Sequence, residues 1–202
     1  LRTYFTPEGL RVVRRTETKP TWVWGYQLLR FGRQGEAHPL TNPTLTVEEN
    51  RIEYCREPLI ERYENRETGI RQSLVIARPP AGSGPLVLVA RLSGDLSARL
   101  AAERSGVEFL HHGVAPLQYG GLWAVDANGR ELPAQFSLDG DELRLEISDA
   151  GAAYPLSIDA IITGLATSGG LSPIPNWSAE VNLSDALFGC SVSTTGDVNG
   201  DG

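Results

Sequence analysis

The sequence predicts an all-β fold of the antiparallel, sandwich-like type, and two signals lead to this prediction. Apolar and polar residues alternate with a period of two through most of the chain, as they do in half-buried strands. In "LRLEIS", for example, Leu143, Leu145 and Ile147 fall on one face. Turn residues recur between such runs, about 8–12 residues apart, which is typical of sandwiches. Over residues 10–163 we therefore expect antiparallel strands, with less than about a tenth of helix.

Three further runs show the alternation in chain order. They are "WVWGYQL" with Trp22, Trp24, Tyr26 and Leu28 on one face, "RIEYC" with Ile52 and Tyr54, and "GIRQSLVIA" with Ile70, Leu74 and Ile76. Gln72 is the exception on the apolar face of the last run. The predicted core comprises Trp24, Leu86, Leu88, Leu143, Leu145, Ile147 and Ile158. Trp22 and Trp24 could stack on sugars, but we expect them in the core, where aromatic side chains contribute most of the buried area.

Turn signals separate these runs. Asn128-Gly129 is the strongest hairpin signal, because both residues of such a turn are expected at positive φ. Asp139-Gly140 is a second hairpin signal, and "PPAGSGP" at 79–85 is a loop. Residues 95–106, "DLSARLAAERSG", contain good helix formers but also alternate, and the all-β surroundings favour a strand there.

The overall composition limits the classes of function. The chain has 202 residues, 41% of them hydrophobic, and a formal net charge of −7 with a pI of about 5.0. The acidic balance disfavours a nucleic-acid partner. No run of about 20 apolar residues is present, so no membrane-spanning segment is expected. No signal peptide is visible, and a chain that begins at Leu1 is expected to remain after such a peptide is removed or a longer chain is cut.

Cysteine and histidine give little sign of a site. Cys55 and Cys190 could pair in an oxidising compartment, but each sits in a strand-like pattern, and we expect two buried free thiols. His111 and His112 are adjacent on an expected strand and would point to opposite faces, so a shared metal is not expected.

No catalytic constellation is evident either. A dyad of Cys55 or Cys190 with His111 has no support from spacing. The acids Glu48-Glu49, Asp139 with Asp141, and Glu61 with Glu64 resemble glycosidase pairs, which must face each other across a cleft. On an antiparallel sheet such acids are expected mostly on solvated outer faces, and the chain is predicted to be non-catalytic.

The C-terminal segment carries the one metal-binding pattern. Asp197, Asn199 and Asp201 fit positions 1, 3 and 5 of a calcium loop, and Gly202 fits its turn glycine. Later ligands are missing, so the site is incomplete, and binding of Ca²⁺ is expected in the intact protein but weak or absent in this fragment. The alternative is an Asp/Asn/Gly-rich turn that binds nothing.

The domain organisation is inferred from a Gly/Ser/Pro-rich stretch at 164–175, which is predicted to be a linker. Residues 1–163 are then a sandwich-like leader domain. Residues 176–202 resemble the opening of an FG-GAP repeat, the blade unit of integrin-α-type β-propellers. Phe188-Gly189, Ser191-Val192 and the run 196–202, "GDVNGDG", carry this resemblance, and Trp177 and Glu180 fit the strand before it.

Residues 1–175 also resemble the all-β leader that precedes such propellers in secreted bacterial proteins. The matching segments are 50–54 "NRIEY", 63–65 with 69–72, and 154–159 "YPLSID". Ala160 stands where the family has a proline. The leader resemblance implies no biochemical activity.

The resemblance implies a non-catalytic N-terminal module of a secreted or cell-surface FG-GAP repeat protein. It would serve adhesion or extracellular assembly with calcium-stabilised repeats, for a protein or glycan ligand that the sequence does not identify. One alternative is an accessory domain of a secreted hydrolase whose catalytic part lies after residue 202. The other is a subunit of an extracellular filament or sheath that assembles through edge strands.

Overall fold

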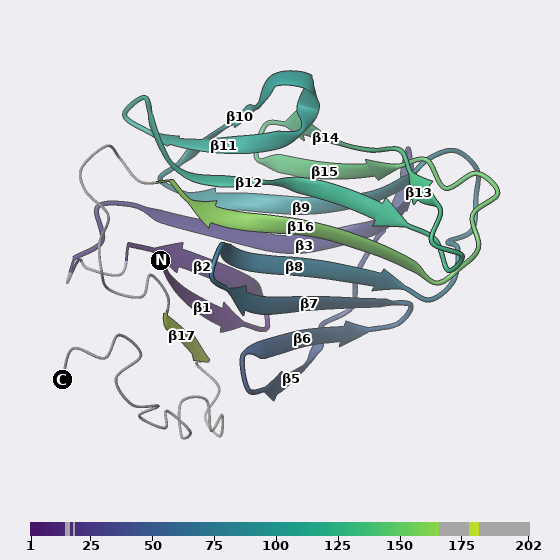
Figure 1. Cartoon of the computed structure of the whole chain (residues 1–202), viewed down its shortest axis with the longest axis horizontal. Coiled ribbons are helices and arrows are strands. Elements are labelled where there is room, and N and C mark those ends of the chain that lie inside the picture. The colour runs from purple at the N-terminus through teal and green to yellow at the C-terminus, as the bar shows by residue number, and fades with distance from the viewer. Residues whose placement is uncertain (15–16, 18, 166–177, 182–202) are drawn as a thin grey trace, which may run out of the picture.

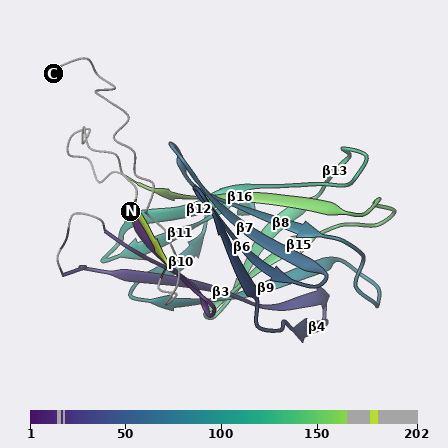
Figure 2. The same cartoon turned by 90° about the horizontal axis from the view of Figure 1, so that it is seen from below.

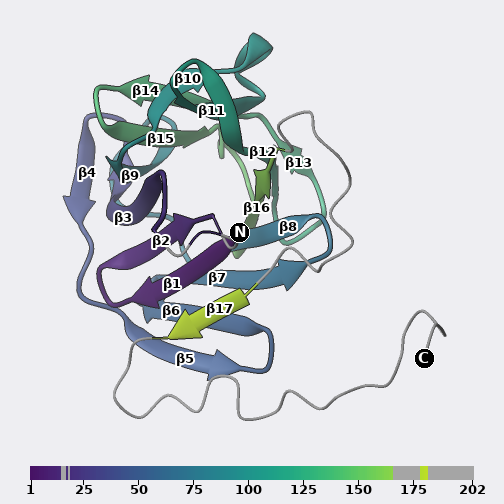
Figure 3. The same cartoon turned by 90° about the vertical axis from the view of Figure 1, so that its left-hand side faces the viewer.

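The computed structural model describes residues 1–14, 17, 19–165 and 178–181, and these residues form two β-sheets packed face to face. Figure 1 shows the larger sheet in front of the smaller one, and Figures 2 and 3 show the two layers from below and from one end. All strand pairs but one are antiparallel. The predicted all-β, sandwich-like fold is confirmed.

The smaller sheet has eight strands in the order β14-β15-β9-β3-β2-β1-β17, with β4 paired to β3. Its strands are β1 (Arg2–Thr6), β2 (Gly9–Val13), β3 (Val23–Arg33), β4 (Glu36–Pro39), β9 (Leu86–Gly94), β14 (Ala134–Asp139), β15 (Glu142–Ile147) and β17 (Ser178–Val181).

The larger sheet has nine strands in the order β10-β11-β12-β16-β8-β7-β6-β5, with β13 paired to β12. Its strands are β5 (Thr44–Glu48), β6 (Arg51–Arg56), β7 (Leu59–Arg66), β8 (Gly69–Ile76), β10 (Ser97–Leu100), β11 (Gly106–His111), β12 (Val114–Val125), β13 (Glu131–Leu132) and β16 (Leu156–Gly164).

One hydrophobic core fills the space between the sheets, because alternate residues of both sheets point inward. Every residue predicted to form the core is buried: Trp24, Leu86, Leu88, Leu143, Leu145, Ile147 and Ile158. Trp22 is buried as well, and the Trp24 ring lies 4.8 Å from the Phe109 ring of the opposite sheet. The prediction that the two tryptophans fill the core is confirmed.

Two local predictions need correction. Residues 95–106 contain β10 but continue into a short 3-10 turn, η1 (Ala102–Arg104), rather than one long strand. The Asn128-Gly129 hairpin joins β12 to β13, yet only Gly129 has positive φ. Asp126 determines this turn, because its carboxylate accepts hydrogen bonds from the backbone N–H groups of Asn128 and Arg130 at 2.9 and 3.0 Å. The loop is therefore an Asx-type turn rather than a two-residue turn.

The Asp139-Gly140 prediction is confirmed, since Asp139 pairs with Glu142 across a two-residue loop. At the other edge of the smaller sheet, β17 pairs in parallel with β1 of the same chain, Arg2 opposite Ser178. The rest of the predicted repeat and nearly all of the predicted linker lie outside the described residues.

Candidate functional site

The predicted calcium ligands Asp197, Asn199 and Asp201 lie outside the described residues, and so does Cys190. Within residues 1–165, apart from 15, 16 and 18, no group of three or more His, Cys, Asp or Glu side chains is placed to hold a metal ion. The one helical element of these residues, η1, is far too short to cross a membrane.

Cysteine and histidine are placed differently from the prediction. Cys55 is free but only half-buried, because it lies on the outer face of β6. His111 ends β11 and His112 has a φ of 50°, so the two rings meet at the hairpin turn, with centroids 4.2 Å apart, instead of pointing to opposite faces. Four strands separate β6 from β11, which places Cys55 and His111 about 24 Å apart and rules out a dyad between them.

Two of the three predicted carboxylate pairs, Asp139 with Asp141 and Glu61 with Glu64, do not face each other across a cleft. Glu48 and Glu49 line an open hollow of about 500 Å³ together with Glu64, and Arg51 pairs with Glu48 there. Asp139 and Asp141 are exposed, and Asp139 accepts a 2.7 Å hydrogen bond from Arg144. Glu61 and Glu64 lie on opposite faces of β7. Glu61 is an exception to the expected solvated position of these acids, because it is 2% exposed and points into the sandwich.

Glu61 is at the centre of a buried polar group, which we call the Glu61 cluster: Arg56, Glu61, Tyr63, Gln72 and Tyr119. The carboxylate accepts hydrogen bonds from Tyr63 Oη at 2.5 Å, Gln72 Nε2 at 2.8 Å and Arg56 Nη2 at 3.3 Å. Gln72 also donates to Tyr63 Oη at 2.9 Å, and the Tyr119 hydroxyl donates to Gln72 Oε1. Strands β6, β7, β8 and β12 thus each contribute to one connected network.

Arg56 anchors the cluster to the opposite sheet. Its Nη1 donates to the Leu28 carbonyl of β3 at 3.2 Å, and its guanidinium carbon lies 5.8 Å from the centroid of the Tyr54 ring. A cavity of about 60 Å³ adjoins the cluster, between the β1–β2 turn and the loop from Leu40 to Pro43. Small-molecule pockets usually measure about 300–1,000 Å³, so this cavity suits one or two water molecules rather than a substrate.

Burial controls the ionisation of the cluster. It raises the pKa of Glu61 above its ordinary value, while the Arg56 charge and the donors Tyr63 and Gln72 act in the opposite direction. Burial also raises the pKa of Tyr63 and of Tyr119 well above the ordinary value, so both hydroxyls stay protonated as donors. Because the carboxylate is held by three donors from the protein itself, the arrangement fits a structural network better than an acid–base catalyst.

A second hollow of about 270 Å³ lies on the outer face of the smaller sheet. Val87 and Val89 form part of its lining together with Arg30 and Arg144. Arg30 donates to Glu142 and Arg144 to Asp139, each at 2.7 Å. Acids of the chain itself therefore already hold both guanidinium groups.

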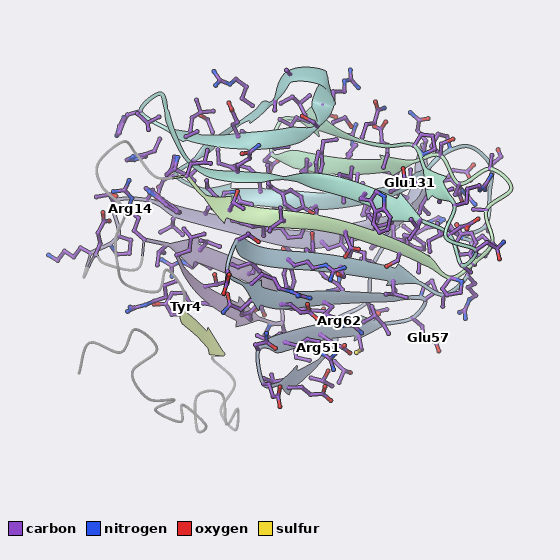
Figure 4. The ribbon with its side chains drawn as sticks, in the orientation of Figure 1. Tyr4, Arg14, Arg51, Glu57, Arg62 and Glu131 are labelled. Atoms are coloured by element: carbon purple, nitrogen blue, oxygen red, sulfur yellow. The ribbon has the colours of Figure 1, made fainter. Side chains whose placement is uncertain are left out.

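The outer face of the larger sheet carries a different arrangement, which Figure 1 shows toward the viewer. One row of directly paired residues crosses six strands there: Thr46, Glu53, Arg62, Ser73, Asp159 and Trp123. Figure 4 labels Arg62 of this row and the neighbouring Arg51. Arg62 Nε donates to Glu53 at 2.7 Å. Asp159 accepts from Arg71 Nε and Nη2 at 3.1 and 2.9 Å, and from the Ser73 hydroxyl.

Trp123 is the exposed end of this row. The large hydrophobic side chains exposed in the described part of the chain are Val114, Trp123 and Leu165. Val114 and Trp123 belong to β12, and Leu165 directly follows β16. We call the surface formed by Trp123, Asp159, Arg71, Ser73 and Arg62 the Trp123 face.

Sequence reasoning missed the two most distinctive residues of these sites. Glu61 alternates with Leu59 and Tyr63, so the period of two already indicated an inward position. Gln72, which pairs with Tyr63, broke the apolar face of the neighbouring strand. Trp123 has no such signal, because the register between β12 and β16 shifts between Gly120 and Trp123.

Comparison with family models, with curated proteins and with solved structures finds no match to this chain. The FG-GAP resemblance therefore stays a prediction from the sequence.

Proposed function

We propose that this chain is a non-catalytic interaction module of a secreted or cell-surface protein, acting in adhesion or extracellular assembly. The Trp123 face is the observation that carries the proposal. It is a broad sheet surface on which the charges Arg62, Glu53, Arg71 and Asp159 are held in pairs, while a large aromatic ring is left exposed to solvent. Exposed aromatic residues of this kind are typical of binding surfaces.

The interior supports the same proposal. The most deeply buried of the candidate acids, Glu61, is engaged by Arg56, Tyr63 and Gln72, and the adjoining cavity is small. A glycosidase needs a second carboxyl group about 5–9.5 Å away across a substrate cleft. Glu64, the partner suggested by the sequence, faces away from Glu61 on the same strand.

The calcium-stabilised FG-GAP repeat is the second part of the proposal, and the motif at 196–202 supports it. In the full-length protein, Asp197, Asn199 and Asp201 would supply three of the six to eight oxygens that Ca²⁺ needs. The acids Asp139 and Asp141 offer a matched control, because they also flank a glycine in an exposed turn.

The binding function is tested with labelled chain on intact, washed cells of the producing organism, together with location of the full-length protein by antibody. Saturable binding and an extracellular location are expected. A protein confined to the cytoplasm, or a chain that does not bind the cells, would overturn the proposal.

Calcium is tested separately by titration of the full-length protein. Substitution of Asp197 and Asp201 by Ala is expected to abolish a binding event that the Asp139→Ala, Asp141→Ala control retains. Equal binding by both variants would remove the calcium loop from the proposal.

A further inference from the structure

We propose that the Trp123 face binds a neutral polysaccharide, with the Trp123 ring against the apolar face of a sugar and the Arg71–Asp159 pair hydrogen-bonding its hydroxyl groups. The inference rests on the proposed function and names its ligand class.

The exposed ring is the first step. Trp123 is 46% exposed, whereas Trp22 and Trp24 are 1% and 0% exposed. A Trp side chain contributes most to stability when it is fully buried, so the exposed part of the Trp123 ring is available to a ligand without loss of core packing. The flat apolar surface of an indole matches the C–H face of a pyranose ring, which combines apolar and hydrogen-bonding edges.

The local backbone directs this ring outward. The pairing of β12 with β16 shifts register between Gly120 and Trp123, and Gly121 within the shift has a φ of 65°. Such bulges re-aim side chains on a sheet. Gly121 is exposed and carries no side chain two positions before Trp123 on β12, so a flat ligand can approach the indole there.

The polar neighbours provide the second half of a sugar site. Asp159 lies directly opposite Trp123, and Arg71 holds it through two parallel hydrogen bonds. This bidentate pairing fixes the planes of both groups. The Arg71 side chain is 41% exposed, so it presents N–H donors to solvent next to Asp159, and Ser73 and Arg62 continue the polar row. Adjacent donors and acceptors in fixed positions match the hydroxyl groups of a sugar.

The charges on this surface favour a neutral polymer over a charged one. Arg71 is paired with Asp159 and Arg62 with Glu53, so the charges of these two pairs balance. The chain as a whole carries −7, which disfavours a polyanion. A neutral polymer requires neither ion pair to be broken.

The distribution of apolar surface disfavours a protein as the ligand. Val114 lies nine residues before Trp123 on β12, or about 25–30 Å away at the rise of a strand. The Trp123 ring is therefore isolated from the other exposed hydrophobic side chains, whereas stable protein interfaces have a contiguous apolar core.

The test is affinity electrophoresis of the chain in gels that contain soluble glucan, xylan, mannan or galactan, with alginate as a charged polymer. We expect retardation by at least one neutral polysaccharide. Trp123→Ala should weaken binding at least about tenfold, as loss of a central aromatic residue does in other interfaces. Trp123→Phe should retain part of it, and Arg71→Ala should weaken it less than Trp123→Ala.

Val114→Ala is the matched control, since Val114 is 52% exposed at the far end of the same strand, and it should bind like the unmodified chain. Circular dichroism establishes that each variant is folded. Four results would overturn the inference: no binding to any neutral polysaccharide, equal binding by Trp123→Ala, binding to alginate alone, or capture of a protein at this face instead. If the chain still binds washed cells in those cases, the proposed function stands and only the glycan assignment falls.

Discussion

The inner and outer faces of the larger sheet use the same residue types for different ends. On the inner face, Glu61 meets Arg56 beside Tyr63, and on the outer face Asp159 meets Arg71 beside Trp123. The inner pair has side chains 5% and 3% exposed, and the outer pair 41% and 14%. Burial makes the loss of a single member of the inner network costly, because each polar group depends on the others for its hydrogen bonds. The outer network is free to contact a ligand, because water can replace any partner that is removed.

The largest effect is expected inside. Glu61→Ala should destabilise the chain by about 3–5 kcal/mol, because it leaves the Arg56 guanidinium buried without its counter-charge. The free energy of unfolding is measured in urea, with Glu64→Ala on the outer face of the same strand as the control. A double substitution, Arg56→Met with Glu61→Leu, should cost less than Glu61→Ala alone. A loss below about 1 kcal/mol for Glu61→Ala would show that the cluster is not needed for folding.

The apolar part of the core provides a reference for the cost of Glu61→Ala. Leu145→Ala should cost about 2–5 kcal/mol, the range for a well-packed core leucine, because Leu145 is fully buried between Phe136 and Leu88 of the neighbouring strands. The same urea titration measures it. A cost below about 1 kcal/mol would mean that the inward and outward faces of β15 are assigned the wrong way round.

The period of two accounts for the parts of this comparison that the sequence predicted. It identified Leu145, Trp24 and the other core residues, because burial on one face of a strand requires an apolar residue at every second position. It also indicated the Asp139-Gly140 hairpin. The rest depends on side-chain contacts between distant segments. The turn at Asn128 depends on hydrogen bonds to the Asp126 carboxylate. The inward position of the charged Glu61 depends on Arg56 and Gln72. The exposure of Trp123 results from a bulge that interrupts the alternation.

The pH dependence of stability is expected to be smaller and to distinguish the two faces further. The pKa of Glu61 is raised in the folded chain above its ordinary value of 4.5, so the folded state binds the proton more tightly than the unfolded state. This contribution to stability is complete below the unfolded pKa and is lost as the pH rises through the folded pKa. Relative to Glu61→Gln, the unmodified chain should therefore lose stability as the pH rises above 4.5. Urea titrations of both chains from pH 4 to 8 measure this difference in the free energy of unfolding. A gain in stability of the unmodified chain relative to Glu61→Gln as the pH rises would contradict the raised pKa.

The outer ion pairs should give the smallest effect. Arg62→Ala removes a 2.7 Å hydrogen bond to Glu53, but surface pairs of this kind contribute about 0–1 kcal/mol, since water solvates the partner that remains. Thermal unfolding of this variant should be nearly unchanged. A loss comparable to that of Glu61→Ala would show that the outer row is as structural as the inner cluster.

The most direct test of this division is to compare Trp123→Ala with Trp24→Ala in the same urea titration. The two residues are an exposed tryptophan of the larger sheet and a buried tryptophan of the smaller sheet, at 46% and 0% exposure. Trp24→Ala should cost about 3–5 kcal/mol or prevent folding, as large aromatic truncations in cores do. Trp123→Ala should cost about 1 kcal/mol or less, as surface substitutions do. A large loss of stability for Trp123→Ala would contradict the account, because it would make Trp123 part of the fold rather than part of a binding surface.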